Sequence, residues 1–365
     1  MKRISFLNKA PDIDAGADTD TIVKTYQRNR SRKFLGLFVF IGLLVILSGY
    51  AIKMGAYEVG LRETYELIWD HLTHWSDGLT SLKMRVVWND RLPRLLTALI
   101  AGSGLAAAGA CMQSMLKNPL ADPYTTGISS GASFGATIAI ILGITIGGSG
   151  GTVLNAFVFA LIPTAVILGL STIRKASPTT MILAGISVMY IFNALTSWIM
   201  LTADDSAMAA AYEWTIGTLN KGSWSNLPAM FIVTLAGTLA IMFSTKYLNA
   251  MNAGDDFAKT LGVNVNRIRL ILLAVVSIIA AGIVSFTGVI GFVGLVAPHM
   301  ARILIGSDNK LLIPGSIICG AIMMVGCDIL SKAFTVAPVP IGIVTSLIGG
   351  PAFLLLILRQ KKEAW

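Results

Sequence analysis

Long apolar runs that are almost free of charged residues recur along the whole chain from residue 34 onward. A run of about 20 such residues crosses the hydrocarbon core of a bilayer as a helix. Within lipid only helices and closed barrels satisfy all of their backbone hydrogen bonds, so the repeated pattern predicts a helical bundle. We therefore predict an all-α, polytopic membrane protein with ten transmembrane helices, at 34–52, 92–114, 126–146, 152–170, 179–200, 227–244, 270–289, 290–305, 311–330 and 339–358.

The overall composition excludes an ordinary soluble domain. Hydrophobic residues make up 55% of the 365-residue chain and charged residues 13%, whereas a soluble domain carries about 25% charged residues. So few charges cannot cover a surface that faces water, but they suit a bundle that faces membrane lipid. The net charge of +9 does not indicate nucleic-acid binding, because the distribution of basic residues follows membrane topology.

Lysine and arginine indicate how the spans are oriented. If the N-terminus lies in the cytoplasm, most of the 28 basic residues fall in inner segments: 1–33, 115–125, 171–178, 245–269, 306–310 and the C-terminal end. Because inner loops are enriched in basic residues, we expect both termini in the cytoplasm. The chain then consists of a cytoplasmic tail (1–33), a transmembrane domain (34–358) whose longest inner loop is 245–269, and a second cytoplasmic tail (359–365).

The chain lacks the common metal-site motifs of enzymes and the motif of a pump that binds its own ATP. No G-x-x-x-x-G-K-[ST], H-E-x-x-H or C-x-x-C motif occurs, and we predict no metal site, no bound cofactor and no catalytic residue. The three cysteines, Cys111, Cys319 and Cys327, fall inside predicted spans. We expect them to be buried apolar residues rather than a disulfide or a metal site.

Ionisable residues inside the spans are few, and such residues mark ion and proton pathways. Asp328 lies four residues before Lys332, a spacing that allows an ion pair within one helix. A transporter driven by an ion gradient usually needs more buried charge, so this class is a remote alternative. An intramembrane enzyme is disfavoured because the spans contain no paired carboxylates and no nucleophile with a base.

Four stretches together resemble one family. They are RLPRLLTALIAGSGLAAAGACMQSMLKNPLADPYTTGISSGASFGA (91–136), GDDFAKTLGVNV (254–265), GFVGLVAPHMAR (291–302) and PVPIGIVTSLIGGPAFLLLIL (338–358). Their order and spacing are similar to those of the FecCD-like permeases, the membrane subunits of ABC importers for iron–siderophores, haem and cobalamin. The resemblance runs from about the first span to the C-terminus and leaves the 1–33 tail outside.

The resemblance implies a type II ABC importer permease fold in the cytoplasmic (inner) membrane. It implies a homodimer or a pair of homologous permeases, two cytoplasmic ABC ATPase subunits that hold the ATP and Mg²⁺, and an extracytoplasmic substrate-binding protein. The expected cargo is a metal chelate, with a ferric siderophore first. Cobalamin, haem and oxyanion importers use similar scaffolds and stay open as alternatives.

The stretch GDDFAKTLGVNV corresponds by resemblance to the coupling helix that contacts the ATPase. Asp256, Ala258, Leu261 and Gly262 are its candidate residues, with Ala258 and Leu261 on an apolar edge and Gly262 as the helix stop. From the residues alone, a surface helix between two spans is the alternative interpretation.

Three basic residues at outer span ends match positions at which the family binds its substrate-binding protein. Arg91 and Arg94 are one helical turn apart in RLPR, and Lys332 lies at the outer end of the ninth span. Anchoring of span ends at the membrane surface is the alternative role for all three. In the same outer region, Trp214 is expected to be an aromatic residue of the membrane interface first and a contact for the cargo second.

The stretch NPLADP (118–123) is either a plain turn between two spans or a segment with a function of its own. Its two prolines bar continued helix, and irregular backbone at membrane depth must face protein or water. By resemblance, Asn118 and Leu120 are residues of the cytoplasmic gate, and Ser177 and Pro178 in KASPTT belong to the partner gate segment. A capped turn remains the alternative for each of these residues.

Overall fold

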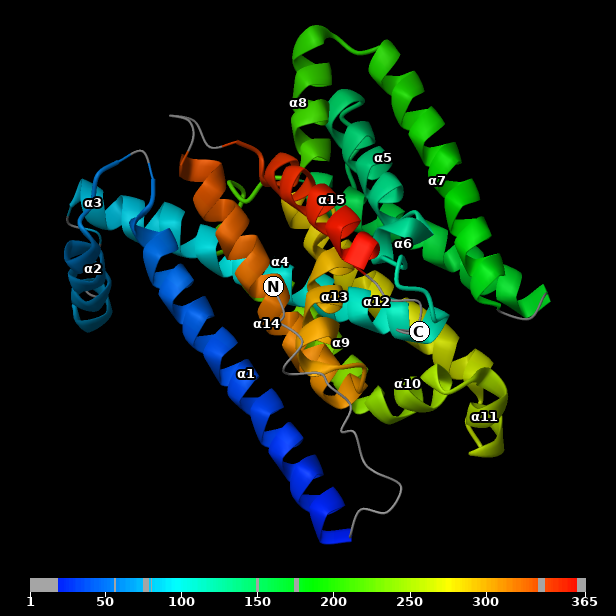
Figure 1. Cartoon of the computed structure of the whole chain (residues 1–365). Coiled ribbons are helices and arrows are strands. Elements are labelled where there is room, and N and C mark those ends of the chain that lie inside the picture. The colour runs from blue at the N-terminus through cyan, green and yellow to red at the C-terminus, as the bar shows by residue number, and fades with distance from the viewer. Residues whose placement is uncertain are drawn as a thin grey trace.

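The structure is a computed structural model that describes residues 19–55, 57–74, 79, 81–148, 151–173, 177–333 and 339–359. Within these ranges all regular secondary structure is helical (Figure 1). The helices are α1 (Thr19–Lys53), α2 (Leu61–Thr73), α3 (Leu82–Arg85), η3 (Val86–Arg91), α4 (Leu92–Leu116), η4 (Pro123–Thr126), α5 (Ile128–Ile141), α6 (Gly151–Ile173), α7 (Pro178–Leu201), α8 (Asp205–Ile216), α9 (Leu227–Phe243), α10 (Thr245–Asn252), α11 (Asp255–Thr260), α12 (Val265–Thr287), α13 (Val293–Ile305), α14 (Asn309–Ala333) and α15 (Ile341–Arg359).

Each of the predicted spans falls on a helix of the structure, namely α1, α4, α5, α6, α7, α9, α12, α13, α14 and α15. Among the described residues, six helical stretches are long and apolar enough to cross a membrane. A seventh is added if α9 and α10, which meet at a bend of 54°, form one broken span, whereas α5, α13 and α15 are apolar but shorter. The all-helical membrane architecture is confirmed, while the number of spans and the side on which the termini lie stay predictions.

Two boundaries differ from the prediction. α1 begins at Thr19, so the later part of the predicted 1–33 tail is continuous with the first span. The spans 270–289 and 290–305, which nearly merge in the sequence, are separate helices: α12 ends at Thr287 and α13 begins at Val293. Gly288 and Phe292 both have positive φ, and these turns in the backbone break the helix within GVIGFVG.

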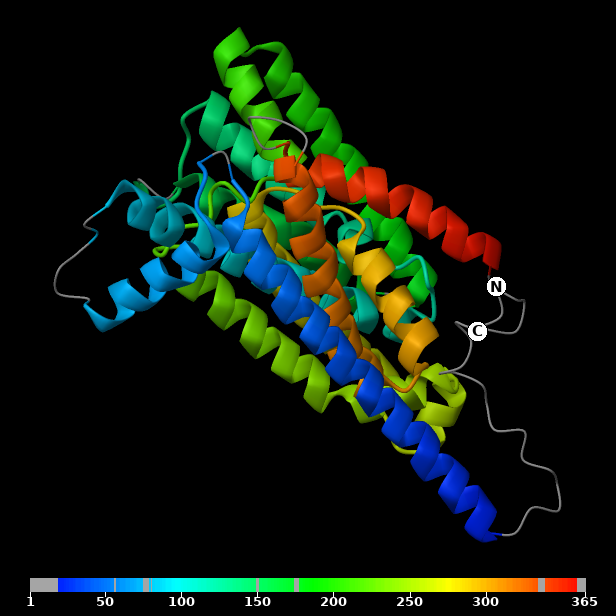
Figure 2. The ribbon, with the colours of Figure 1, turned by 60° about the vertical axis from the view of Figure 1, so that its left-hand side comes forward.

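α4 is the central helix of the bundle and packs against α9, α12, α13 and α14 (Figure 1). In the most apolar part of the span Leu82–Leu116, 78% of the residues are buried, against 17% in the span that belongs to α1 and 17% in α7. Figures 1 and 2 show α1 and α7 along the outside of the bundle. These two helices present most of their apolar side chains outward, where a membrane protein meets lipid.

Small residues let α4 approach its neighbours closely. Gly102 lies against the backbone of Gly320 in α14, and Gly109 lies against the backbone of Gly294 in α13. A Cβ at either position of α4 would collide with main-chain atoms of the facing helix. Helices in lipid gain little from hydrophobic burial against each other, so such close packing provides much of their association.

Trp214 is buried inside the bundle, so the expectation that it is an exposed aromatic residue of the membrane interface is wrong. It is 2% exposed and packs in α8 among buried residues of α5, α6 and α12. Gly288 makes room for this turn of α8, because a Cβ there would meet the Trp214 carbonyl oxygen. The neighbouring Tyr212 of the same helix is exposed.

We predict that Gly109→Ala destabilises the bundle, because the added methyl group has no space between α4 and α13. Overpacking of this kind costs roughly 1–3 kcal/mol, which thermal unfolding of the purified protein in detergent would detect as a lower midpoint. Gly42→Ala in α1 is the matched control, since nothing lies within 4 Å of a Cβ built there. Equal midpoints for the two variants would contradict the close approach of α4 and α13.

Candidate functional site

The segment that follows α4 is a built loop rather than a plain break. Lys117 caps α4 with a φ of 50°, in the left-handed region. The Asn118 side chain accepts a hydrogen bond from the Leu120 backbone N–H at 2.9 Å, and the Asp122 carboxylate accepts one from the Tyr124 N–H at 2.8 Å. Leu120 is 51% exposed at the tip. The loop therefore carries its own side-chain caps and presents one large apolar residue.

Asp122 is the buried carboxylate of this loop. It is 9% exposed, and one carboxylate oxygen lies 2.6 Å from the point that a Cβ of Gly294 would occupy. Burial raises the pKa of Asp122 to about 6, against the opposing effect of the hydrogen bond from Tyr124. The loop thus seats a carboxyl group against α13 at a place where only glycine leaves room for it.

Ser177 and Pro178 begin α7. The Ser177 hydroxyl accepts a hydrogen bond from the Thr180 N–H at 3.1 Å, and Pro178 occupies the first turn, where its missing N–H is tolerated. Further along α7, a Cβ on Gly185 would meet the backbone of η4 at Thr126. The loop after α4 therefore continues directly into a contact with α7. A gate role for Asn118, Leu120, Ser177 and Pro178 stays a prediction.

α11 has one buried face and one exposed apolar face. Ala258 is fully buried, whereas Phe257 and Leu261 are 52% and 61% exposed. Gly262 follows with a φ of 79° and ends the helical turn. The apolar edge predicted from Ala258 and Leu261 is thus divided between two sides of α11, and Phe257 joins Leu261 on the outer side. The glycine stop is confirmed.

The two aspartates at the start of α11 differ in environment. Asp255 forms ion pairs with Lys117 at 3.0 Å and with Arg269 of α12 at 3.0 Å. Partial burial opposes ionisation of Asp255, but the hydrogen bonds from Arg269 and Lys117 hold its pKa below the usual value. The Asp256 side chain is 96% exposed and pairs with Lys259 within the helix at 2.8 Å. Sequence reasoning named Asp256 and missed Asp255.

At the other end of α4, the Arg91 guanidinium forms hydrogen bonds with backbone carbonyl groups. It is 4% exposed and donates to the carbonyl oxygens of Ile52 at 3.1 Å, Lys53 at 2.7 Å and Tyr57. Lys53 is the last residue of α1. Arg91 therefore caps the C-terminal end of α1, where carbonyl groups lack helical partners.

Arg94 and Lys332 share the buried carboxylate of Asp328. The Arg94 Nε lies 2.7 Å from one carboxylate oxygen and the Lys332 Nζ 2.7 Å from the other, and the Asp328 side chain is fully buried. Arg94 also donates to Asn220 and, at 3.4 Å, to Ser331. The ion pair expected between Asp328 and Lys332 is present in the structure. All three cations are engaged within the chain. Docking of a partner through Arg91, Arg94 and Lys332 stays a prediction.

Burial, rather than residue type, decides what these charges contact. The RLPR spacing placed Arg91 and Arg94 on one helix face, but it did not show that α1 and α14 cover that face. Asp255 had a usable signal: it lies three residues before Ala258, on the face that α11 buries. Arg269 had none, since a basic residue near a span end is ordinarily exposed.

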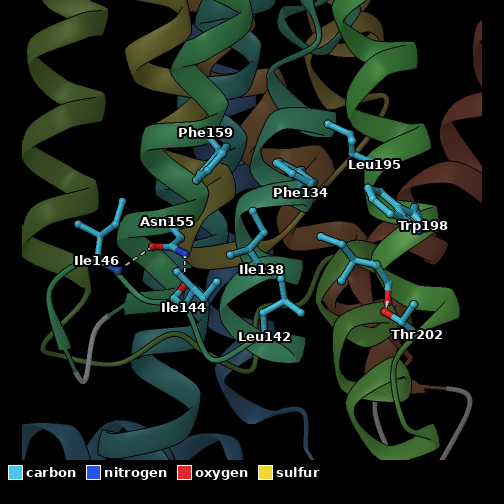
Figure 3. A pocket seen from close by; sticks show the side chains of 11 residues that line it. Phe134, Ile138, Leu142, Ile144, Ile146, Asn155, Phe159, Leu195, Trp198 and Thr202 are labelled. Carbon is cyan, nitrogen blue, oxygen red and sulfur yellow. Dashed lines mark hydrogen bonds between the residues drawn. The ribbon is translucent and has the colours of Figure 1, made fainter.

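A cavity of about 580 Å³ lies between α5, α6 and α7 (Figure 3). Its walls are apolar and include Phe134, Phe159 and Trp198. The Asn155 side-chain amide is the main polar group of the wall. It donates a hydrogen bond to the Ile144 carbonyl oxygen at 2.7 Å and accepts one from the Ile146 N–H at 2.9 Å. The cavity therefore offers shape and apolar surface but no reactive group.

The described residues contain no cluster of three or more histidine, cysteine, aspartate or glutamate side chains that could hold a metal ion. Cys111, Cys319 and Cys327 are buried free thiols. The charged side chains described above at the two ends of α4 pair with one another and with backbone carbonyl groups. Such an arrangement can hold helices and loops in position.

Comparison with known proteins identifies the family. The model of the FecCD transport family matches residues 42–359. The chain belongs to the FecCD transport family. An ABC transporter permease protein of Methanocaldococcus jannaschii is 38% identical over 94% of this chain and 99% of its own length. The hemin transport system permease protein of Yersinia pestis is 33% identical over 92% of this chain and 98% of its own.

A solved structure supports the same assignment. An inward-facing conformation of a metal-chelate type ABC transporter matches with a TM-score of 0.78 and 28% identity, over 89% of this chain and 99% of that chain. The family match spans the loop after α4, α11 and the Asp328 cluster. These parts of the site therefore belong to the region shared with the FecCD transport family.

We predict that lowering the pH from 7.5 to 5 stabilises the folded protein through Asp122. Its pKa is raised to about 6 in the folded state and is near 3.9 in an unfolded chain, so the folded state gains stability as pH falls through 6. The gain is about 1 kcal/mol between these two pH values.

The measurement is the thermal unfolding midpoint of the wild type and of Asp122→Asn at both pH values. The variant should lack the part of the midpoint shift that Asp122 contributes. A shift of the same size in both proteins would show that Asp122 is ionised in the same way in the folded and unfolded states.

Proposed function

We propose that this chain is the membrane-spanning permease subunit of an ABC importer that moves a metal chelate into the cell, and that the cargo is a ferric siderophore. The supporting observation is the match to a metal-chelate type ABC transporter over nearly all of that chain's length. Membership of the FecCD transport family and the similarity to a hemin permease agree with it. Hemin is itself an iron chelate.

In this proposal the chain performs no covalent chemistry. It lines a pathway between two permease subunits, identical or homologous, and alternates between outward-open and inward-open states. Two cytoplasmic ABC ATPases bind the ATP and Mg²⁺, in keeping with the absence of a P-loop motif from this sequence. Their binding surface is the exposed side of α11, where Phe257 and Leu261 are available for a partner.

We further propose ten spans in the inner membrane with both termini in the cytoplasm. The positive-inside distribution of lysine and arginine supports this orientation. It places α11 and the loop after α4 on the cytoplasmic side, together with the start of α7. The loop's exposed Leu120 and the Ser177–Pro178 helix start then act as the cytoplasmic gate.

An extracytoplasmic substrate-binding protein delivers the cargo at the opposite end of α4. Arg91, Arg94 and Lys332 are the proposed docking residues, but their own-chain contacts add a requirement. Docking through Arg94 or Lys332 would exchange the pairing with Asp328 for carboxylates of the binding protein, since neither cation stays stable when buried without a partner.

Cobalamin, haem and oxyanions are alternative cargoes for the same scaffold. A gradient-driven transporter is the remaining alternative, and Asp328 is its best candidate for an ion-coupling group. Arg94 and Lys332, however, already occupy the positions beside the Asp328 carboxylate that a coupling ion would need.

The proposal predicts that the tagged chain, purified in a mild detergent, brings down a P-loop ATPase in equal amount. Cells that express the system should then take up a labelled ferric siderophore, with uptake abolished by ATP depletion and retained when the proton gradient is collapsed at constant ATP.

Labelled hemin and cobalamin are tested in the same uptake assay. Uptake of one of these in place of the siderophore would change the cargo but keep the transporter class. A homo-oligomer without any ATPase, together with uptake that follows the proton gradient, would overturn the proposal in favour of a secondary transporter.

A further inference from the structure

α11 is attached to the end of α4 by one carboxylate. Asp255, the first residue of α11, pairs with Lys117 at 3.0 Å and with the Arg269 guanidinium at 3.0 Å and 3.2 Å. Arg269 is 1% exposed, and its Nε also donates to the Met115 carbonyl oxygen at 3.3 Å. The carboxylate therefore reaches the last turn of α4 twice, directly through Lys117 and indirectly through Arg269.

Lys117 lies directly before the loop that follows α4, so its ion pair with Asp255 connects α11 to the start of that loop. Lys117 has a positive φ as the cap of α4, and the next residue is Asn118, which begins the proposed gate loop. The opposite side of α11 exposes Phe257 and Leu261. α11 thus lies between a surface available to a partner and the base of the loop.

We propose that Asp255 is the positioning residue that transmits movement of α11 to the loop after α4. This inference rests on the proposed function, because the movement comes from an ATPase bound at α11. The linkage is rigid on the protein side, since Arg269 is buried and holds both Asp255 and the end of α4. Loss of the carboxylate charge should leave α11 able to bind its partner but unable to displace the loop.

The experiment uses the complete complex in proteoliposomes and measures cargo transported per ATP hydrolysed. Asp255→Asn should still co-purify with the ATPase and hydrolyse ATP, while transport per ATP falls about tenfold or more, within the range of coupling between distant sites. Asp255→Glu should recover part of the ratio. Asp205→Asn, which removes an exposed carboxylate at the first position of α8, is the matched control and should keep the wild-type ratio.

The outcomes separate the inference from the proposed function. An unchanged transport-to-ATP ratio in Asp255→Asn overturns the inference. Failure of that variant to bind the ATPase also overturns it, because Asp255 would then shape the docking surface. Lys117→Gln, which leaves the Arg269 pair in place, should reduce the ratio as well, and a wild-type ratio there contradicts the direct connection. A wild-type chain that binds no ATPase overturns the proposed function itself.

A separate observation concerns α2, whose circumference is divided into three faces. Leu61, Tyr65, Trp69 and Leu72 are 46%, 46%, 70% and 55% exposed, and at 3.6 residues per turn they fall within an arc of about 80°. Thr64 and His71 are buried against the chain on one side of this arc, whereas Arg62, Glu66 and Asp70 lie exposed on the other. An apolar face between a docked face and a charged face is the pattern of a helix that lies in a membrane surface.

The contacts of α2 place this apolar face at the end of a lipid-facing helix. A Cβ on Gly49, in the last turns of α1, would meet the Tyr65 hydroxyl, and Val45 and Ile46 of α1 are 65% and 71% exposed. An ion pair of 2.6 Å between Glu63 and Lys83 fixes α2 to α3. In Figure 2, α2 runs across the direction of α1 rather than continuing it.

We infer that α2 seats its apolar face in the phospholipid headgroup region on the side where α1 ends. Trp69 and Tyr65 are the side chains that favour this region. The exposed apolar surface of α1 continues into the apolar face of α2. The acidic groups Glu66 and Asp70 then point to water. This inference needs α1 to span the membrane but does not depend on what the protein transports.

The test places a fluorescent label at Trp69→Cys, with Glu66→Cys as the matched control, in full-length protein reconstituted in phosphatidylcholine nanodiscs. The label at 69 should be quenched by lipids with a nitroxide near the headgroup and protected from aqueous iodide. The label at 66 should show the reverse.

Equal iodide quenching at the two positions would overturn the inference. So would a label at 69 that lipid nitroxides do not reach and that only an added binding protein shields, since the face would then be a protein-docking surface. The three native cysteines are buried, so labelling is confined to the introduced thiol.

Discussion

The close approach of α4 to α13 and α14 holds the centre of the bundle together. At Gly102 and Gly109 the helix backbones meet with no space for a side chain. This contact makes α4 an axis that is buried along most of its length, with α1 and α7 left to face lipid. An interior of this kind is packed without spare volume, so the middle of α4 cannot shift against its neighbours. Conformational change therefore involves the ends of α4 and the loops attached to them.

Both ends of α4 carry charges that the bundle neutralises internally. At one end Asp328 lies between Arg94 and Lys332, and at the other Asp255 lies between Lys117 and Arg269. Each cluster joins α4 to a helix distant in the sequence. Buried charges are costly unless they are paired, so these clusters fix which helices α4 can contact. Because the two clusters lie at opposite ends of α4, each end of this helix is attached to the bundle by its own ion pairs.

The sequence predicted the helices well and the environment of individual side chains poorly. Apolar runs located the helices on which the predicted spans fall, because a helix in a bilayer must be apolar over most of its length. Arg91 and Arg94 were expected at the surface, yet α1 and α14 cover them. Trp214 was expected at the interface, yet α8 turns it toward α5 and α12. In each case the deciding factor is a contact between segments far apart in the chain, which local spacing does not contain.

Short segments of the chain are enough to assign the class of protein, because apolar runs, few charges and the NPLADP and GDDFAKTLG motifs can be recognised without the fold. Contacts between distant helices settle which of two adjacent aspartates connects α11 to α4, which cations are buried, and which face of α2 is left uncovered. Polarity and helix propensity act over a few residues. Ion pairing and burial, by contrast, depend on which distant helix arrives at the same place.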